Sequence, residues 1–179
     1  MTSLEILQHY WGYTQFRPPQ DQIIDAVIRK HDVVAILPTG GGKSVCFQVP
    51  ALMQEGICLV ITPLIALMQD QVKQLKQPGI AAVSSHSGMH HREIDITLDN
   101  CIYGNNKFLY LSPERLQTEL FQERAKKMKV CLVAIDEAHC ISEWGHNFRP
   151  SYTKLKDFIE FTGIKKVSAF TATATPEVV

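Results

Sequence analysis

The chain has 179 residues, of which 45% are hydrophobic and 20% charged, and its 18 basic residues balance 18 acidic ones. This length and composition are typical of one globular domain with a buried core. The balanced charge excludes a global cationic field that would draw the domain onto nucleic acid, so any such contact must be local.

The sequence also bears on the compartment. No apolar run reaches membrane-spanning length, and the N-terminus lacks the basic region and apolar stretch of a signal peptide. The five cysteines form no Cys-x-x-Cys pair and lie mostly in apolar segments, which is typical of free thiols in a reducing compartment. We therefore expect a cytoplasmic protein with no membrane partner.

The predicted elements alternate between helix and strand along the chain. Ser3 is the expected cap of a helix over residues 4–10, and Pro18-Pro19 is expected to open a second helix. Apolar runs predict strands over residues 33–36, 57–62, 80–83, 108–111, 130–135 and 167–170. Further helices are expected over residues 45–52, 90–104 and 152–161, from Pro113, and from Pro63 with Leu64, Leu67, Met68, Val72 and Leu75 on the apolar face. This order predicts an α/β fold with a parallel sheet, and the continuous apolar run over residues 57–62 is expected of a strand buried on both faces.

The last residues carry a further signal. Thr175-Pro176-Glu177 is typical of a helix start, with a cap followed by proline and an acidic residue. Only Val178 and Val179 come after it. We therefore expect the sequence to be part of a longer protein.

A glycine-rich stretch between the first predicted strand and the helix after it organises the chain. It reads Leu37-Pro38-Thr39-Gly40-Gly41-Gly42-Lys43-Ser44. Glycines allow the positive φ angles that turn backbone N–H groups toward a phosphate, and the helix N-terminus adds positive dipole. Lys43 is expected to reach the β- and γ-phosphates of a nucleotide, and the Ser44 hydroxyl is expected to hold Mg²⁺. The alternative is an ordinary glycine-rich turn.

A pair of carboxylates comes directly after the predicted strand over residues 130–135. The segment is Asp136-Glu137-Ala138-His139, and ligands of open parallel sheets lie at the carboxyl ends of strands. About 90 residues separate Lys43 from Asp136, which leaves room for roughly three βα units. Asp136 is expected to bind Mg²⁺ and Glu137 to orient and polarise an attacking water. The alternative is an acidic N-cap pair for the next helix.

An aromatic segment comes next, over residues 139–150. Gly145 and Pro150 break helices, so Trp144 and Phe148 are expected on a loop. There they could stack on single-stranded bases while neighbouring His and Arg side chains contact phosphates. That both aromatic side chains belong to the core is an equally supported alternative.

Five segments resemble motifs 0, I, Ia, II with its aromatic-rich loop, and III of the RecQ family of superfamily 2 DNA helicases, in the order of that family. The segments are residues 13–20, 38–44, 62–72, 136–150 and 170–175. The string Ala-His-Cys-Ile-Ser-x-Trp-Gly-His-x-Phe-Arg-Pro is close to diagnostic, and Leu37 at the usual first glycine favours a helicase-type loop over a kinase type. The resemblance implies an α/β RecA-like P-loop domain over residues 1–179, a mostly parallel sheet with helices on both faces.

The resemblance implies roles for residues at the nucleotide. Tyr13 would stack on adenine, with Arg17 nearby, and Gln20 would read the adenine; Pro19 replaces a usual glycine there. The phosphates would lie against the P-loop, and the catalytic set would consist of the P-loop lysine, two acidic residues and a histidine. These positions are Thr39, Gly40, Gly41, Gly42, Lys43, Ser44, Asp136, Glu137 and His139.

The resemblance also implies DNA contacts. Trp144, Phe148 and Arg149 would sense single-stranded DNA, and His139 and His146 would help transmit that signal to the ATP site. Thr171 and Thr173 would couple hydrolysis to domain movement. Residues 63–71 would lie along the DNA backbone.

The regions that this family carries beyond motif III are not in the sequence. A second RecA-like domain would close the ATP site with an arginine finger, whose loss costs about 10³–10⁵ in rate in other P-loop enzymes. The parent would be an ATP- and Mg²⁺-dependent 3′-to-5′ helicase that unwinds duplex DNA in recombinational repair, and this chain alone would be nearly inactive. The alternatives are a stand-alone nucleotide- or DNA-binding module, a P-loop small-molecule kinase and an RNA helicase. The sequence indicates no oligomeric state.

Overall fold

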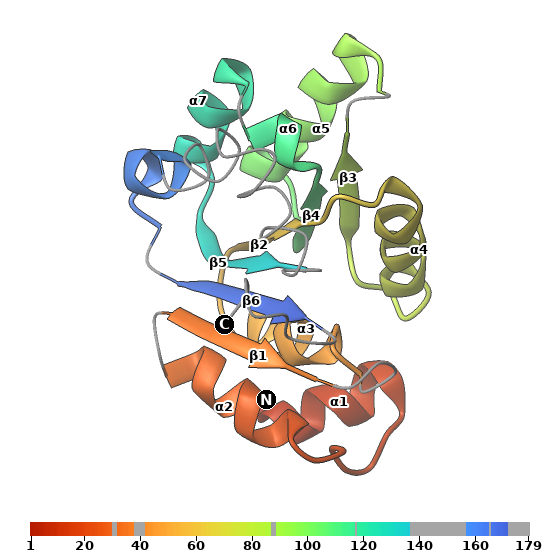
Figure 1. The fold of residues 1–179 in the computed structure, drawn as a ribbon. Helices are drawn as coiled ribbons and strands as arrows, with labels where there is room; N and C mark the ends of the chain where they lie inside the picture. The colour runs from red at the N-terminus through yellow and green to blue at the C-terminus, as the bar shows by residue number, and fades with distance from the viewer. Residues whose placement is uncertain are drawn as a thin grey trace.

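A computed structural model describes residues 1–29, 32–37, 42–86, 89–116, 118–136, 157–164 and 166–171. Its centre is a six-stranded sheet in the order β1-β6-β5-β2-β4-β3 (Figure 1). Every neighbouring pair of strands is parallel, as predicted. The strands are β1 Asp32–Ile36, β2 Ile57–Ile61, β3 Ala82–Ser85, β4 Phe108–Leu111, β5 Val130–Ile135 and β6 Val167–Thr171.

Helices cover both faces of the sheet. On one face lie α2, α3 and α4, with α1 packed against α2 and α3; on the other lie α5, α6, α7 and the helical residues 157–162 (Figure 1). This three-layer arrangement confirms the predicted fold class. The helices are α1 Ser3–Trp11, α2 Gln20–Arg29, α3 Val45–Leu52, α4 Ile65–Lys76, α5 His91–Tyr103, α6 Pro113–Leu116 and α7 Glu119–Lys127.

The central strands are apolar throughout because both of their faces are covered. In β2, Cys58 and Val60 belong to the core cluster beneath α3 and α4. Ile57, Leu59 and Ile61 belong to the cluster on the opposite face. Since successive side chains of a strand point to opposite faces, a strand between two helical layers buries every residue.

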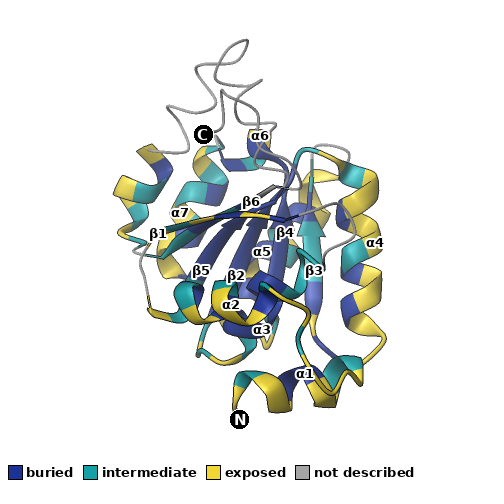
Figure 2. Cartoon of the chain, turned by 60° about the horizontal axis from the view of Figure 1, so that its bottom comes forward, coloured by how far each residue is buried: buried dark blue, intermediate teal, exposed yellow. Residues whose placement is uncertain are grey.

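Strand β1 differs from this expectation. It lies at one end of the sheet order. Val34 is 65% exposed and Ile36 is 47% exposed, whereas Ala35 between them is buried (Figure 2). The burial on both faces that was predicted for residues 57–62 is found in β2, whereas only one face of the edge strand β1 is well covered.

Two helix starts were placed wrongly from the sequence. The cap of α1 is Thr2, whose Oγ1 accepts a hydrogen bond from Glu5 N at 3.2 Å, and Ser3 is already helical. Helix α2 begins at Gln20, after a cis peptide bond between Pro18 and Pro19.

The apolar face of α4 is narrower than predicted. Met68, Val72 and Leu75 are buried, but Leu64 is 48% exposed and Leu67 is 38% exposed. Leu64 precedes the helix in an extended conformation. The contact stripe therefore lies along positions i, i+4 and i+7, and Leu64 and Leu67 lie outside it.

Candidate functional site

Residues that lie far apart in the sequence meet at the carboxyl edge of the sheet. Strand β1 leads into the P-loop, and Asp136 directly follows β5. The Lys43 ammonium lies 3.0 Å from Asp136 Oδ1, with the Lys43 side chain 16% exposed and that of Asp136 1% exposed. The structure thus brings the predicted phosphate-binding lysine and the predicted metal-binding carboxylate into one ion pair.

The end of the P-loop is shaped by Gly42 and the start of α3. Gly42 has a φ of +73°, a conformation that favours glycine. Ser44 is the N-cap of α3, yet its side chain makes no capping hydrogen bond within the described residues. The half-buried Ser44 hydroxyl therefore lies beside the helix N-terminus without being used to cap it.

The segment before α2 is attached to this loop by Gln20. Its Oε1 accepts from Arg17 N at 2.9 Å, and its Nε2 donates to Gly42 O at 3.2 Å. A Cβ on Gly42 would lie only 2.1 Å from Gln20 Nε2, so the contact requires glycine there. Gln20 is buried, whereas Arg17 and Tyr13 are exposed to solvent.

A chain of polar side chains that the sequence had not placed at the nucleotide site extends behind Asp136. Gln71 Nε2 donates to Asp136 Oδ2 at 3.0 Å, and the Tyr110 hydroxyl donates to Gln71 Oε1 at 2.7 Å. Gln48 Nε2 in turn donates to the Tyr110 hydroxyl at 3.2 Å. Burial raises the pKa of Tyr110 above its usual range. The available signal was a polar group inside otherwise apolar elements, Gln48 in α3 and Tyr110 in β4.

Many predicted site positions lie outside the described residues, so their roles stay predictions. Thr171 ends β6, but its side chain is not among the described ones. The positions outside are Thr39, Gly40, Gly41, Glu137, His139, Trp144, His146, Phe148, Arg149 and Thr173.

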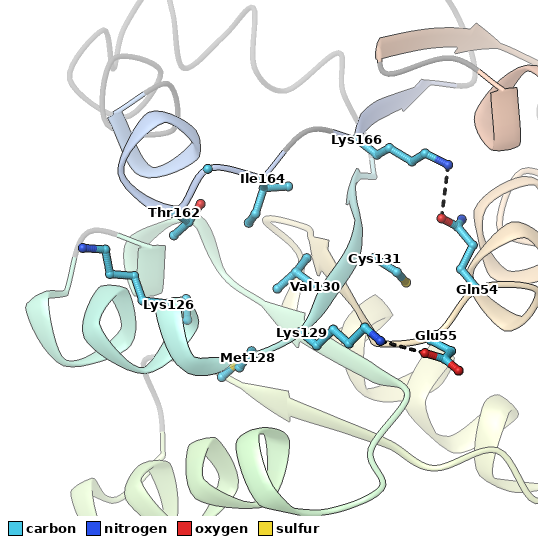
Figure 3. Close-up of a pocket in the computed structure, with 12 residues that line it drawn as sticks. Gln54, Glu55, Lys126, Met128, Lys129, Val130, Cys131, Thr162, Ile164 and Lys166 are labelled. Atoms are coloured by element: carbon cyan, nitrogen blue, oxygen red, sulfur yellow. Dashed lines mark hydrogen bonds and ion pairs between the residues drawn. The ribbon is translucent and has the colours of Figure 1, made fainter.

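A separate hollow of about 720 Å³ lies at the starts of β5 and β6, at the opposite edge of the sheet from Asp136 (Figure 3). Two pairs of its polar side chains contact each other. Lys129 Nζ lies 2.7 Å from Glu55 Oε2, and Lys166 Nζ lies 3.2 Å from Gln54 Oε1. These contacts join the turn between α3 and β2 to the residues before β5 and β6. The candidate nucleotide site lies at the opposite, carboxyl edge of the sheet.

A metal-binding cluster and a membrane-spanning helix are both absent from the residues that the structure describes. Among them, no group of three or more His, Cys, Asp or Glu side chains is arranged to hold a metal ion. None of the described helices is both long enough and apolar enough to cross a membrane.

Comparison with known protein families shows which family this chain belongs to. The DEAD/DEAH box helicase family matches residues 17–179. The chain belongs to this family. The P-loop, Asp136 and the RecA-like layers described above are therefore parts of a helicase domain.

Within the family, this helicase domain is similar to RecQ proteins. It is 48% identical over 175 residues to the ATP-dependent DNA helicase RecQ of Bacillus subtilis, covering 97% of this chain and 30% of that protein. It is 45% identical over 179 residues to the probable ATP-dependent DNA helicase RecS of the same organism, covering 99% and 36%. The chain thus spans about a third of the length of these relatives, and its resemblance to the RecQ family is confirmed.

Solved structures support the same fold. The DUF1998 helicase MrfA, in a crystal structure with DNA, aligns with a TM-score of 0.78 at 18% identity, over 98% of this chain and 25% of that one. Sequence identity this low supports a shared fold and no shared function. It agrees with the predicted RecA-like architecture.

Proposed function

We propose that this domain is the ATP-binding half of a RecQ-like 3′-to-5′ DNA helicase that acts in DNA repair and recombination in the cytoplasm. The observation that carries the proposal is the 3.0 Å contact between Lys43 Nζ and Asp136 Oδ1 beside the N-terminus of α3. A lysine and a carboxylate at that place are what a P-loop nucleotide site requires. DNA is proposed as the substrate because the relatives are named as ATP-dependent DNA helicases.

The phosphates would bind where the P-loop meets α3. Backbone N–H groups of Thr39 and Gly40–Gly42 would face them, and the helix dipole would favour their negative charge. Lys43 would leave Asp136 for the β- and γ-phosphates. In the structure, Lys43 and Asp136 instead neutralise each other's charge.

The residues present suit Mg²⁺. Asp136 offers a carboxylate and Ser44 a hydroxyl that caps nothing within the described chain, and Mg²⁺ prefers such oxygen ligands together with phosphate and water. When bound, Mg²⁺ would neutralise charge on the phosphates. Glu137, next to Asp136, would orient the attacking water, with His139 close by in the sequence.

The base would bind beside the segment before α2. The exposed ring of Tyr13 is free to stack on adenine. Gln20 and Arg17 lie next to the P-loop, and Gln20 carries the amide needed to read the adenine edge. Binding would replace the contacts that this amide now makes with the chain.

Single-stranded DNA would pass over the carboxyl edge near α4, where Leu64 and Leu67 are exposed. Two hydroxyls that directly follow strands there, Thr62 Oγ1 after β2 and Ser112 Oγ after β4, are buried without a partner among the described residues.

Other residues would couple DNA binding to ATP hydrolysis. The aromatic-rich loop would sense the DNA, and two threonines at and after the end of β6 would couple hydrolysis to movement of the domains. These residues are Trp144, His146, Phe148, Arg149, Thr171 and Thr173.

A second RecA-like domain would complete the site with an arginine finger. Without it, transition-state charge is not neutralised, which costs about 10³–10⁵ in rate. We therefore expect the 179-residue chain to bind nucleotide weakly and to hydrolyse almost none.

The deciding experiment measures ATP hydrolysis with and without single-stranded DNA. It compares this chain with a longer protein that continues through a second RecA-like domain, each as wild type and as Glu137→Gln. We expect turnover only in the longer protein, stimulated by DNA and abolished by Glu137→Gln.

Other outcomes would favour other functions. A longer protein that hydrolyses ATP without regard to DNA would contradict the role of Trp144 and Phe148. Binding of nucleotide or DNA without turnover in either protein would support a stand-alone binding module instead.

A further inference from the structure

The hydrogen-bond chain behind Asp136 permits one arrangement of donors and acceptors. The Asp136 carboxylate only accepts, so the Gln71 amide nitrogen must face it and the Gln71 carbonyl oxygen must face Tyr110. The Tyr110 hydroxyl then donates to Gln71 and accepts from the Gln48 amide nitrogen. Because burial raises the pKa of Tyr110, the hydroxyl keeps the proton that this arrangement needs.

Each oxygen of Asp136 contacts a different side chain among the described residues. Lys43 contacts Oδ1 and Gln71 contacts Oδ2, each at 3.0 Å. A phosphate that enters the site would compete with Asp136 for Lys43, because the lysine is attracted to both negative charges. It would attract the neutral Gln71 amide less strongly, and Tyr110 holds the other end of that amide.

Gln71 also belongs to an element that reaches the surface. Helix α4 packs into the core through Met68, Val72 and Leu75, and the half-buried Gln71 lies beside this stripe. Any shift of α4 therefore acts directly on the carboxylate, although Gln71 and Asp136 are 65 positions apart in the sequence.

We propose that Gln71 is a positioning residue of the nucleotide site, which keeps Asp136 oriented when Lys43 moves to the phosphates and links α4 to that carboxylate. The inference rests on the proposed function. Tyr110 and Gln48 act one step further back, by fixing which end of the Gln71 amide faces Asp136.

The test compares how much Mg²⁺ strengthens nucleotide binding in variants of the chain. A fluorescent ATP analogue is titrated in excess Mg²⁺ and again in EDTA, and the ratio of the two affinities is the readout. Gln71→Met keeps the length of the side chain but removes both hydrogen bonds. Gln74→Met is the matched control, because Gln74 is an exposed glutamine of the same helix.

We expect Gln71→Met to lower the Mg²⁺-dependent gain in affinity by about 10-fold, the usual effect of losing a side chain that orients a metal ligand. The affinity of Gln71→Met in EDTA should equal that of the wild type. Gln74→Met should show the wild-type affinity both in Mg²⁺ and in EDTA. A purely structural role would weaken both affinities together. Tyr110→Phe, which leaves Gln71 in place, should lower the gain in the same direction and carries the test if Gln71→Met does not fold.

Two results would overturn the inference, and they differ. If Gln71→Met and Tyr110→Phe keep the wild-type gain while Asp136→Asn loses it, the nucleotide site stands and Gln71 does not position it. If Asp136→Asn also keeps the gain, the proposed magnesium site itself is wrong, and the inference fails with it.

Discussion

Individual side chains of this domain show two ways of burying an ionisable group. The Asp136 carboxylate is 1% exposed and lies in contact with Lys43 and Gln71, since a buried charge needs such partners. The thiols of Cys46 and Cys101 are buried in the neutral form instead. Burial raises the pKa of each from the ordinary value of 9.0 to about 12.

The raised pKa of Cys101 predicts how stability depends on pH. Between pH 9.0 and about 12 the thiol ionises in the unfolded chain but not in the folded one, so the unfolded state binds fewer protons. The free energy of unfolding must then fall as the pH rises through this window. Cys101→Ala should make that fall shallower by up to about 1.4 kcal/mol per pH unit.

Urea unfolding of the wild type and Cys101→Ala at several pH values measures this difference. At neutral pH, below both pKa values, the two proteins should show the same pH slope, which serves as the internal control. Equal slopes above pH 9.0 would show that the Cys101 thiol ionises as readily in the folded chain as in the unfolded one.

At the scale of elements, several backbone contacts hold the turn between α3 and β2. Lys107 Nζ donates to the carbonyl oxygens of Gln54 and Gly56. Ile57 N donates to Lys129 O at 2.7 Å, which begins the pairing of β2 with β5. Gly56 has a φ of +107°, and a Cβ there would lie 2.3 Å from Lys129 O. The turn therefore starts the pairing of the two central strands, whose register shifts by one residue between Ile57 and Cys58.

Replacing Gly56 by alanine should lower the free energy of unfolding by more than about 1 kcal/mol, because both the positive φ and the contact with Lys129 O oppose a Cβ. Gly79→Ala is the matched control. Gly79 has a φ of +94° but nothing within 4 Å of the added Cβ. Chemical unfolding should show a larger loss for Gly56→Ala, and equal losses would mean that backbone conformation alone matters.

At the scale of the whole molecule, the sheet gathers one site from distant segments. Lys43 precedes α3, Gln71 lies on α4, and Asp136 follows β5. A ligand that binds these side chains binds only the folded chain, because the unfolded chain does not bring them together. Nucleotide binding should therefore stabilise the whole domain.

Mg²⁺-ATP should raise the melting temperature of the wild type but not of Lys43→Ala. At a free ligand concentration of about 100 times Kd the stabilisation is about 2.7 kcal/mol. Lys127→Ala is the control, since Lys127 is exposed at the end of α7. The expectation is measured by thermal unfolding against nucleotide concentration. A shift retained in Lys43→Ala would place the nucleotide away from the P-loop.

Much of the fold was predictable because its signals are local. Strands β4 and β5 and helix α3 begin and end at the predicted residues, since short apolar runs between breaking residues mark them well. The cap of α1 at Thr2 and the exposure of Leu64 and Leu67 were not predicted. Neighbouring candidates such as Thr2 and Ser3 have nearly equal propensities, and only packing separates them.

The sequence by itself determined the alternation of strands and helices, the P-loop and the resemblance to the RecQ family, because each depends on spacing along the chain. The tertiary structure alone decided the strand order β1-β6-β5-β2-β4-β3, which puts Val34 and Ile36 on an edge. It also decided that Gln71 and Tyr110 stand behind Asp136. Such contacts join residues that are remote in sequence, and they form only when the helices pack on the sheet. The spacing of residues along the chain therefore does not predict them.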